Sequence, residues 1–549
     1  MRPALRSLTL LLLALATLGV LSLRFTLLPA GRVGREVPAV SGRLEVLLGA
    51  RRIGWAREDG QGVLWLPAEV VREHFDPALR LTGRDKAQTS SAPWRLTAAS
   101  PGTEAFLAAG EVLVEFHAPG GWVPIEVLAE MYGIVLRRGG SRLLIDWAGR
   151  EIPVVSARRP VRLRGRPWPL WPGKVVPAGT PLLVYDRVGG WLLVRSEGGV
   201  AGYVPVGQVQ EAGTRLIELP PRPDPVRVRG PVCLTWEHVI RPGGPDLTAI
   251  GPLPGVNVVS PTWLHLAGED GSLSSACHAS YVRWAHARGY AVWVLVGNNF
   301  DPDLTRRVLQ DGKAREHLIR QLLVYCRLFG LDGVNVDFEN VYPTEKGAFV
   351  RFVEELSRLA HPEGLVVSVD VTVKSPSPTW SGFLDRRALA RAADYLAVMT
   401  YDEHYAGSPR AGSVASLPWV EQGIRGLLEE VPPGKLLLGI PFYTRLWKLE
   451  RPPGGAPKLT SRALGMEEVE ALLAERGIEP TFDPASGQDY ARWEEGGATF
   501  QVWLENERSI LARLKLAAKY GLAGVASWRR GFEKPAVWDV IAAELNSLR

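Results

Sequence analysis

The stretch Leu331-Asp332-Gly333-Val334-Asn335-Val336-Asp337-Phe338-Glu339-Asn340 decides both the fold and the chemistry predicted for this chain. Side chains alternate between the two faces of a strand. The apolar residues therefore share one face, which is suited to packing under helices: Val334, Val336 and Phe338. The polar residues share the other face: Asn335, Asp337 and Glu339. The pattern predicts a buried strand that carries a ladder of polar groups.

Two carboxylates on one strand face, with Cα atoms about 6–7 Å apart, are costly to bury unless they are paired or catalytic. Like charges at this distance raise one pKa, so one carboxyl can keep its proton near neutrality. A protonated acid beside an anionic neighbour is the arrangement that glycoside cleavage uses. Solvated acids at a strand end, or a metal site, would give the same local pattern.

The segment resembles the signature of glycoside hydrolase family 18, the chitinase-like family, which is written DGxDxDxE. Asp332, Gly333, Asp337 and Glu339 match that signature, whereas Asn335 stands where the family usually has Asp. In having Asn at this position, the chain resembles the bacterial branch of the family that lyses cell walls and spore cortex. Three further motifs follow in the family's order and extend the resemblance from about residue 231 to about 545: Val398–Asp402, Gly439–Arg445 and Ala526–Trp528.

The chain beyond about residue 230 alternates β-like runs with helical patterns, which is typical of a (β/α)8 TIM barrel of the α/β class. The helical pattern of Lys313–Phe329 follows the third strand. The long segment between the last two strands predicts an α+β insertion over about 446–522. Strands are expected near 232–238, 255–261, 291–297, 333–339, 365–373, 394–401, 435–442 and 523–528.

The length of 549 residues predicts several domains. Residues 38–150 contain an internal repeat, because Leu66–Phe75 parallels Val123–Tyr132, and each copy reads as a β-like run followed by a short amphipathic helix. This module resembles the N-terminal stalk module of copper amine oxidases, without any copper ligands. A plain structural α+β domain and a spacer or wall-attachment module both fit it.

Residues 155–213 are rich in strands and tight turns, and they resemble a bacterial SH3-like barrel. Trp168, Trp171, Trp191 and Tyr203 either form an aromatic groove, or Trp191 and Tyr203 fill a small core. Residues 214–229 form a Pro-rich linker that is stiff. The catalytic barrel is expected over residues 230–549.

The N-terminus, residues 1–30, reads as a targeting element. Arg2 and Arg6 precede the apolar run Leu8–Leu23, which has the length of a secretory signal, and Phe25–Leu28 would extend it as a membrane anchor. A cleaved signal and an uncleaved anchor both remain open. Either one predicts an extracytoplasmic protein that is secreted, wall-associated or membrane-anchored.

Composition argues against several other classes of protein. The net charge of +6 is modest, and no Lys/Arg run reaches five residues, which argues against nucleic-acid binding and fits weak attraction to an anionic wall. The three cysteines are too few for a disulfide framework and predict buried free thiols. No motif requires a metal or another cofactor. We expect a monomer.

The resemblance implies roles for individual residues. Glu339 would protonate the glycosidic oxygen, Asp337 would orient the N–H group of the substrate's own acetamido group, and Tyr401 would hydrogen-bond the acetamido oxygen. Attack by that acetamido group gives an oxazoline-like intermediate and retention of the anomer. The predicted substrate-binding residues are Asn335, Asp402, Met399, Tyr443, Arg445, Trp528, Asp370 and Glu237.

The predicted function is an exported retaining hydrolase of β-linked N-acetylglucosamine in a cell-wall glycan, with peptidoglycan as substrate. A chitinase is one alternative. A catalytically inactive, lectin-like barrel is another, although members of that kind lack the acid, which is present here as Glu339.

Overall fold

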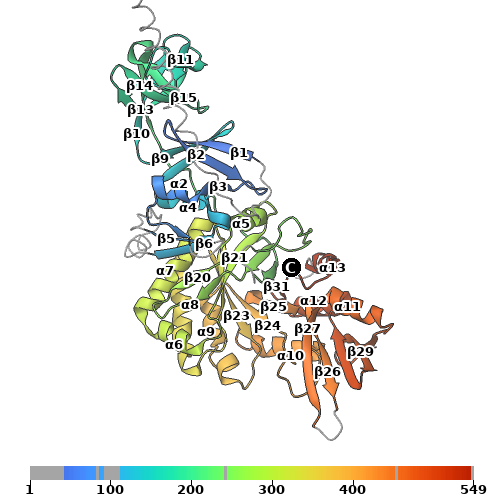
Figure 1. Cartoon of the computed structure of the whole chain (residues 1–549). Helices are drawn as coiled ribbons and strands as arrows, with labels where there is room; N and C mark the ends of the chain where they lie inside the picture. The colour runs from blue at the N-terminus through green and yellow to red at the C-terminus, as the bar shows by residue number, and fades with distance from the viewer. Residues whose placement is uncertain (1–41, 82–85, 92–111, 240–243, 452–455, 546–549) are drawn as a thin grey trace, which may run out of the picture. The chain divides into compact units, whose positions relative to one another are not determined.

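A computed structural model describes residues 42–81, 86–91, 112–239, 244–451 and 456–545 (Figure 1). The predicted targeting element at residues 1–30 lies outside them. Among the described residues, no helix has the length and apolar character that crossing a membrane requires.

Eight parallel strands close into a barrel, as the sequence predicts, because the β18 edge pairs with β21. Figure 1 shows these strands at the centre, with helices such as α8, α9 and α10 around them. Each strand lies within three residues of its predicted bounds. The strands are β17 (Val232–Glu237), β18 (Val258–Pro261), β21 (Ala291–Gly297), β22 (Gly333–Asp337), β23 (Val366–Thr372), β24 (Tyr395–Met399), β25 (Leu436–Pro441) and β31 (Gly524–Trp528).

The alternation read from β22 is correct. Val334, Val336 and Phe338 pack in the core between strands and helices, where the ring of Phe338 stacks on Phe352 with centroids 5.5 Å apart. A separate cluster fills the barrel interior with the alternate residues of neighbouring strands, including Trp236, Trp293 and Leu295. The interior of the barrel is therefore packed, and only its end can offer a site.

Several helices start where a side chain caps them, and α7 shows both ends. α7 (Gly312–Phe329) begins at Asp311, whose side chain accepts from Lys313 N, and ends at Gly330 in the left-handed region. This helix confirms the pattern read at Lys313–Phe329. The other barrel helices are α5 (Ala279–His286), α6 (Pro302–Gln310), α8 (Lys346–Ala360), α9 (Arg386–Ala392), α10 (Leu417–Leu428), α12 (Glu507–Lys519) and α13 (Ala536–Glu544).

An α+β insertion follows β25, as predicted. It is a five-stranded antiparallel sheet in the order β27-β26-β30-β29-β28 with one helix, α11 (Met466–Glu475). Its strands end at Leu504, so the expected end near residue 522 was too late, because α12 is a barrel helix packed against the last barrel strands. The strands are β26 (Tyr443–Glu450), β27 (Lys458–Gly465), β28 (Thr481–Asp483), β29 (Gln488–Glu495) and β30 (Ala498–Leu504).

The N-terminal module contains the predicted repeat as two strand–helix pairs. β3 (Leu64–Pro67) leads into α2 (Ala68–His74), and β7 (Trp122–Pro124) leads into α4 (Ile125–Tyr132). The two copies pair antiparallel, with Leu66 opposite Val123. The rest of its six-stranded sheet is β1 (Gly42–Leu48), β2 (Arg51–Glu58), β8 (Ile134–Gly139) and β9 (Arg142–Trp147), while β4 (Arg80–Leu81), β5 (Lys86–Ser91) and β6 (Val112–His117) form a separate three-stranded sheet.

A second small module follows as a seven-stranded antiparallel sheet in the order β12-β11-β15-β14-β13-β10-β16. The core of this sheet is entirely aliphatic, and Trp191 and Tyr203 are half-buried outside it. The alternative in which these two rings fill the core is therefore wrong. The strands are β10 (Glu151–Ala157), β11 (Val161–Arg164), β12 (Gly173–Val176), β13 (Pro181–Val188), β14 (Trp191–Ser196), β15 (Ala201–Pro205) and β16 (Val209–Leu216).

The three cysteines, Cys233, Cys277 and Cys326, are free and buried, as predicted. Burial raises the pKa of the Cys233 thiol to about 12.

Candidate active site

Asp337 and Glu339 lie at the carboxyl end of the barrel, where β22 stops at Asp337. Glu339 follows two residues later and is held through its backbone. Its N–H donates to Asn298 Oδ1 at 3.0 Å, and its carbonyl accepts from Asn298 Nδ2 at 2.8 Å. Asn298 is 1% exposed and also donates to Thr305. Asn298 thus fixes the backbone of Glu339, and the carboxyl group of Glu339 takes no part in these two hydrogen bonds.

Asp337 combines burial with an open hydrogen-bonding position. Burial raises the pKa of its carboxyl to about 7. Within the described residues, its Oδ1 is buried and has no hydrogen-bond partner. An acceptor in this state is stabilised by a ligand that brings an N–H group.

Glu339 is the stronger candidate for a protonated acid. Its pKa is raised well above the ordinary value, first by burial and then by the charges of Asp337 and Asp402. Two neighbouring carboxyls whose pKa values are driven upward cannot both ionise easily near neutrality. The pair can therefore hold one proton and one negative charge at the same time.

Asn335 is fully buried in a four-partner network behind the carboxyl pair. Its Oδ1 accepts from Trp236 Nε1 at 2.8 Å and from Ser260 Oγ at 3.2 Å. Its Nδ2 donates to Ser368 Oγ at 3.1 Å and to Asp370 Oδ1 at 2.8 Å. Both amide protons of Asn335 are therefore used, and neither is donated to Asp337. Asn335 is also too buried, at 0% exposure, to contact a substrate directly.

Asp370 belongs to the same buried cluster. It is 3% exposed, and its pKa is raised by burial and by the charge of Asp337, against the lowering effect of the Asn335 hydrogen bond. Its hydrogen bond with Asn335 and its charge interaction with Asp337 tie it to both residues.

Tyr401, Asp402 and Tyr443 lie beside the pair. β24 ends at Met399, and Asp402 has φ of 60°, so the chain turns there, as the adjacent Tyr and Asp require. Burial, followed by the charge of Asp370, keeps the pKa of Tyr401 well above its usual range. The Tyr401 hydroxyl therefore remains a donor. Tyr443 donates from its hydroxyl to Asp402 Oδ1 at 2.5 Å.

Three further predicted residues lie at strand ends or just beyond them. Met399 is half-buried at the end of β24. Arg445 donates from Nη1 to Ser461 Oγ at 3.1 Å, and among the described residues its buried Nε has no partner. Trp528 ends β31 half-buried, with its ring centroid 5.9 Å from that of Trp236. Its exposed part could lie under a sugar ring.

Glu237 is placed differently from the prediction. Trp236 points into the barrel, so Glu237 lies on the opposite face of β17. It is 3% exposed, and both of its oxygens pair with Arg530, the second at 2.7 Å. These contacts give it a role in holding the segment after Trp528.

Asn298 is the supporting residue that sequence reasoning missed. Its signal was an Asn pair directly after the apolar run Val294–Gly297, at a strand end. Among the described residues, the non-glycine positions with positive φ are all at this end of the barrel: Asn299, Phe300, Asn340 and Asp402. Strained backbone of this kind is typical of functional sites.

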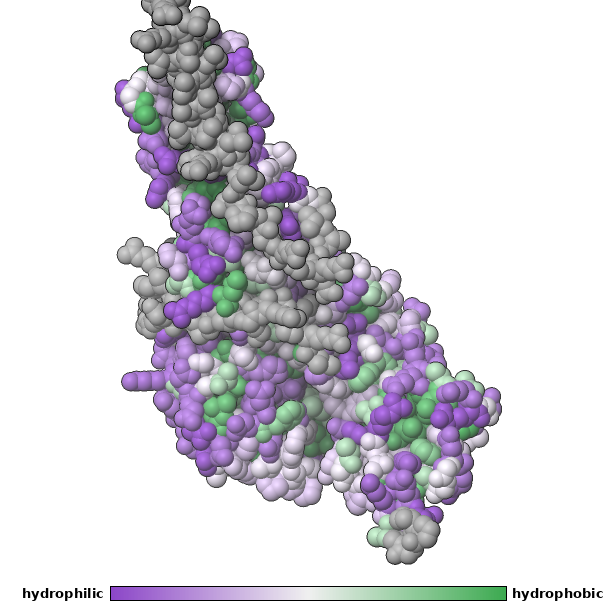
Figure 2. All heavy atoms as spheres, in the orientation of Figure 1, coloured by the Kyte–Doolittle hydropathy of each residue, from purple (hydrophilic) through white to green (hydrophobic). Residues whose placement is uncertain are grey.

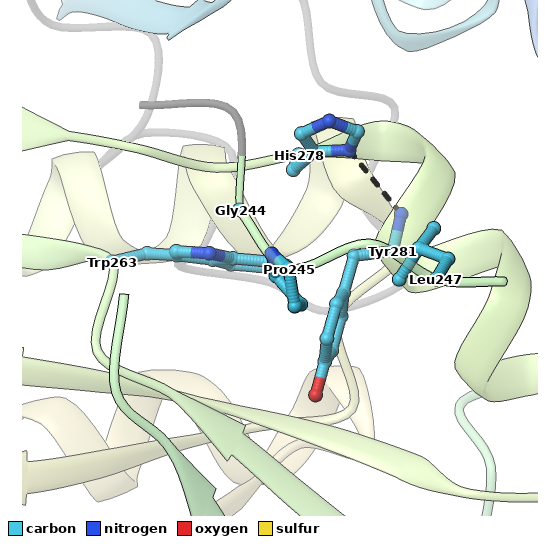
Figure 3. Close-up of a pocket in the computed structure, with 6 residues that line it drawn as sticks. All are labelled: Gly244, Pro245, Leu247, Trp263, His278 and Tyr281. Carbon is cyan, nitrogen blue, oxygen red and sulfur yellow. Dashed lines mark hydrogen bonds between the residues drawn. The ribbon is translucent and has the colours of Figure 1, made fainter. Parts of the chain in front are cut away.

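A separate shallow depression lies beside α5 (Figure 3). Tyr281 N donates to His278 Nδ1 at 3.4 Å on its wall. None of the site carboxylates lines it, so it is not the candidate active site. Its lining residues are Gly244, Pro245, Leu247, Trp263, His278 and Tyr281.

Residues 262–533 match the model of the glycosyl hydrolases family 18. The chain is 27% identical over 284 residues to the "Uncharacterized glycosylase YvbX" of Bacillus subtilis (strain 168), which is 50% of this chain and 80% of that protein. It is 26% identical over 254 residues to the "Cortical fragment-lytic enzyme" of the same organism, which is 46% of this chain but only 58% of that protein.

Among solved structures, a chitinase from Chromobacterium violaceum ATCC 12472 superimposes with a TM-score of 0.51 and 26% identity, over 58% of this chain and 99% of that chain. Three observations support the same assignment: the similar sequences, the closed barrel and the carboxyl pair at its end. The barrel of this chain is that of a glycoside hydrolase similar to the glycosyl hydrolases of family 18.

Proposed function

We propose that this chain is an exported retaining hydrolase that cleaves β-linked N-acetylglucosamine in peptidoglycan with the help of the substrate's own acetamido group. The observation that carries the proposal is the state of two neighbouring carboxyls. Glu339 has a strongly raised pKa, and Asp337 has a buried oxygen without a partner among the described residues.

In the first step Glu339 donates its proton to the glycosidic oxygen. The acetamido carbonyl oxygen attacks the anomeric carbon while the bond from that carbon to the leaving oxygen breaks. The positive charge that develops on the acetamido group lies next to Asp337, whose Oδ1 accepts the acetamido N–H. Stabilising this charge is worth more in the transition state than in the ground state, which is the condition for a rate gain.

Two tyrosine hydroxyls support this step, one directly and one through Asp402. Tyr401 keeps its proton because of its raised pKa, and it donates to the acetamido oxygen. Asp402, fixed by Tyr443, holds a hydroxyl of the distorted sugar. In the second step water attacks the anomeric carbon, gives its proton to the Glu339 carboxylate and opens the oxazoline-like ring. Two displacements at one carbon leave the anomer unchanged.

Support for peptidoglycan as substrate comes from the similarity to a protein named cortical fragment-lytic enzyme, from the Asn at 335 and from the two modules that precede the barrel. Support for export comes from the apolar run Leu8–Leu23 after two arginines. The 2-acetamido group is also present in chitin, and the similarity to chitinases keeps chitin as the second candidate.

Hydrolysis of purified peptidoglycan and of chitin oligomers distinguishes these substrates, with the new reducing ends identified by mass spectrometry. We expect new N-acetylglucosamine reducing ends from peptidoglycan and a lower rate on chitin oligomers. The Glu339→Gln variant is the control for contaminating hydrolases. Faster cleavage of chitin would assign the chain as a chitinase. Binding of either glycan without hydrolysis would make the barrel a lectin.

A further inference from the structure

The loop of residues 165–172 between β11 and β12, which we call the Trp168 loop, exposes large apolar side chains to solvent. Leu170 is 88% exposed, Trp168 is 62% exposed and Trp171 is 38% exposed. Val175 on the adjoining strand β12 is 55% exposed. Such a cluster is unusual on a small module whose core is otherwise complete, and it marks an interaction surface.

Hydrogen bonds and close backbone contacts hold the loop in place, so the fold itself keeps these side chains exposed. Trp171 N donates to Trp168 O at 3.1 Å, and Arg164 Nε donates to Pro169 O at 2.9 Å. A Cβ at Gly165 would come within 2.9 Å of the Trp171 indole, and one at Gly173 within 2.0 Å of Leu163 O. These glycines allow the two strands and the loop to approach closely.

Basic residues flank the Trp168 loop along the sequence. Between residues 152 and 185 the sequence has six basic residues and no Asp or Glu: Arg158, Arg159, Arg162, Arg164, Arg166 and Lys174. The guanidinium of Arg166 lies 4.5 Å from the centroid of the Trp171 ring. Within the described part of the chain, none of the six pairs with a carboxylate, so their charge is available to a partner.

The chemistry of the surface selects the partner. A leucine that is 88% exposed, beside basic residues without a carboxylate partner among the described residues, fits a partner that is both apolar and anionic. Tryptophan and leucine beside arginine and lysine are the side chains that enter the headgroup boundary of a bilayer. Anionic lipids attract basic residues near the membrane surface.

We propose that the Trp168 loop docks this protein on an anionic lipid bilayer, with Trp168 and Leu170 entering the interface and Arg166 and Lys174 contacting lipid phosphates. The surface is separate from the barrel site, so this docking does not depend on the glycan that the barrel cleaves.

Fluorescent labelling of the full-length protein tests this docking. The three native cysteines are buried, so a Leu170→Cys variant takes a single environment-sensitive label at the tip. A label at Leu216→Cys is the matched control, because Leu216 is 49% exposed on β16 of the same module. On vesicles of phosphatidylglycerol and phosphatidylcholine, we expect a blue shift and quenching by brominated acyl chains at position 170 and neither at position 216.

Two substitutions separate the apolar and electrostatic parts. Trp168→Ser and Lys174→Glu should each raise the lipid concentration for half-maximal response of the position-170 label at least tenfold, whereas Lys346→Glu on α8 should leave it unchanged. Pure phosphatidylcholine or high salt should weaken the response. The proposal is overturned if the two labels respond alike, or if Trp168→Ser abolishes binding to purified cell walls while the vesicle response persists. The second result would identify a wall polymer as the partner.

Discussion

Nδ2 of Asn335 donates a hydrogen bond of 2.8 Å to Oδ1 of Asp370, and neither side chain is accessible to a substrate. The amide thereby stabilises the anionic form of Asp370, against the burial and the Asp337 charge that raise its pKa. The residue at 335 therefore sets how negative charge is divided among the buried carboxyls beneath the site, without touching the reacting atoms.

An Asn335→Asp substitution should move the acid limb of the pH profile of kcat/KM upward by about one pH unit. The new side chain either adds a second buried anion beside Asp337 or holds a proton and loses one donated bond to Asp370. Both outcomes raise the pKa at which the coupled carboxyls lose their first proton. The matched control is Asn257→Asp, which adds the same charge near Cys233 at the other end of the barrel. Superimposable profiles for wild type and Asn335→Asp would contradict the assignment.

Glu339→Gln should lower kcat by about 10²–10⁴-fold and change the Kd for glycan fragments by less than about threefold. Glutamine preserves size and hydrogen bonding but cannot deliver a proton. Single-turnover kinetics measures the chemical step, and isothermal titration measures binding. The control is Glu467→Gln, at an exposed glutamate in the first turn of α11. Full activity in the Glu339 variant would remove it from the acid role.

The barrel could be predicted strand by strand because parallel strands buried on both faces are nearly continuous apolar runs. The helices between them supply the expected punctuation, such as Asp311 before α7 and Gly330 after it. The insertion was predicted only as a whole. Its short, half-exposed strands, such as β28 (Thr481–Asp483), lack a distinct hydrophobic period.

Side chains of the site were predictable where they lie along one strand, as for Asp337 and Glu339. Partners from other strands were not, because the register between strands is absent from the sequence. Asn335 meets Ser368 through the pairing of β22 with β23, and the clamp from Asn298 depends on the turn after β21. Glu237 was misassigned because the sequence alone did not show which face of β17 points inward.

Tyr443→Phe should lower kcat/KM about tenfold, because a hydrogen bond to a charged group contributes about 1.5–3 kcal/mol. Its hydroxyl is the donor that holds the Asp402 carboxylate at a turn with φ of 60°. We expect kcat to fall more than KM rises, since Asp402 acts on the distorted sugar. Tyr490→Phe, which removes a hydroxyl bonded to Gln501 in the insertion, is the control.

A double-mutant cycle tests whether Tyr443 acts through Asp402. In an Asp402→Asn background, Tyr443→Phe should cause little additional loss, because the interaction is already gone. Equal losses in both backgrounds would assign Tyr443 an independent contact with the substrate.

Asp337→Asn should stabilise the folded protein at pH 8 while it lowers activity. Burial raises the pKa of Asp337 from 3.8 to about 7 in the folded state. Between these two pH values the unfolded chain has released this proton and the folded chain still holds it, so this group lowers the free energy of unfolding as pH rises through the window. Asparagine does not titrate, and the variant escapes this loss.

The gain in unfolding free energy should be on the order of 4 kcal/mol at pH 8 relative to the difference between the two proteins at pH 4. Urea unfolding at both pH values measures it, and Asp539→Asn, at an exposed aspartate of α13, controls for the change in net charge. A stability difference that does not depend on pH would mean that Asp337 is ionised throughout this range. It would then stand as a plain anion beside Glu339, and the acid limb of the activity profile would have to come from Asp370.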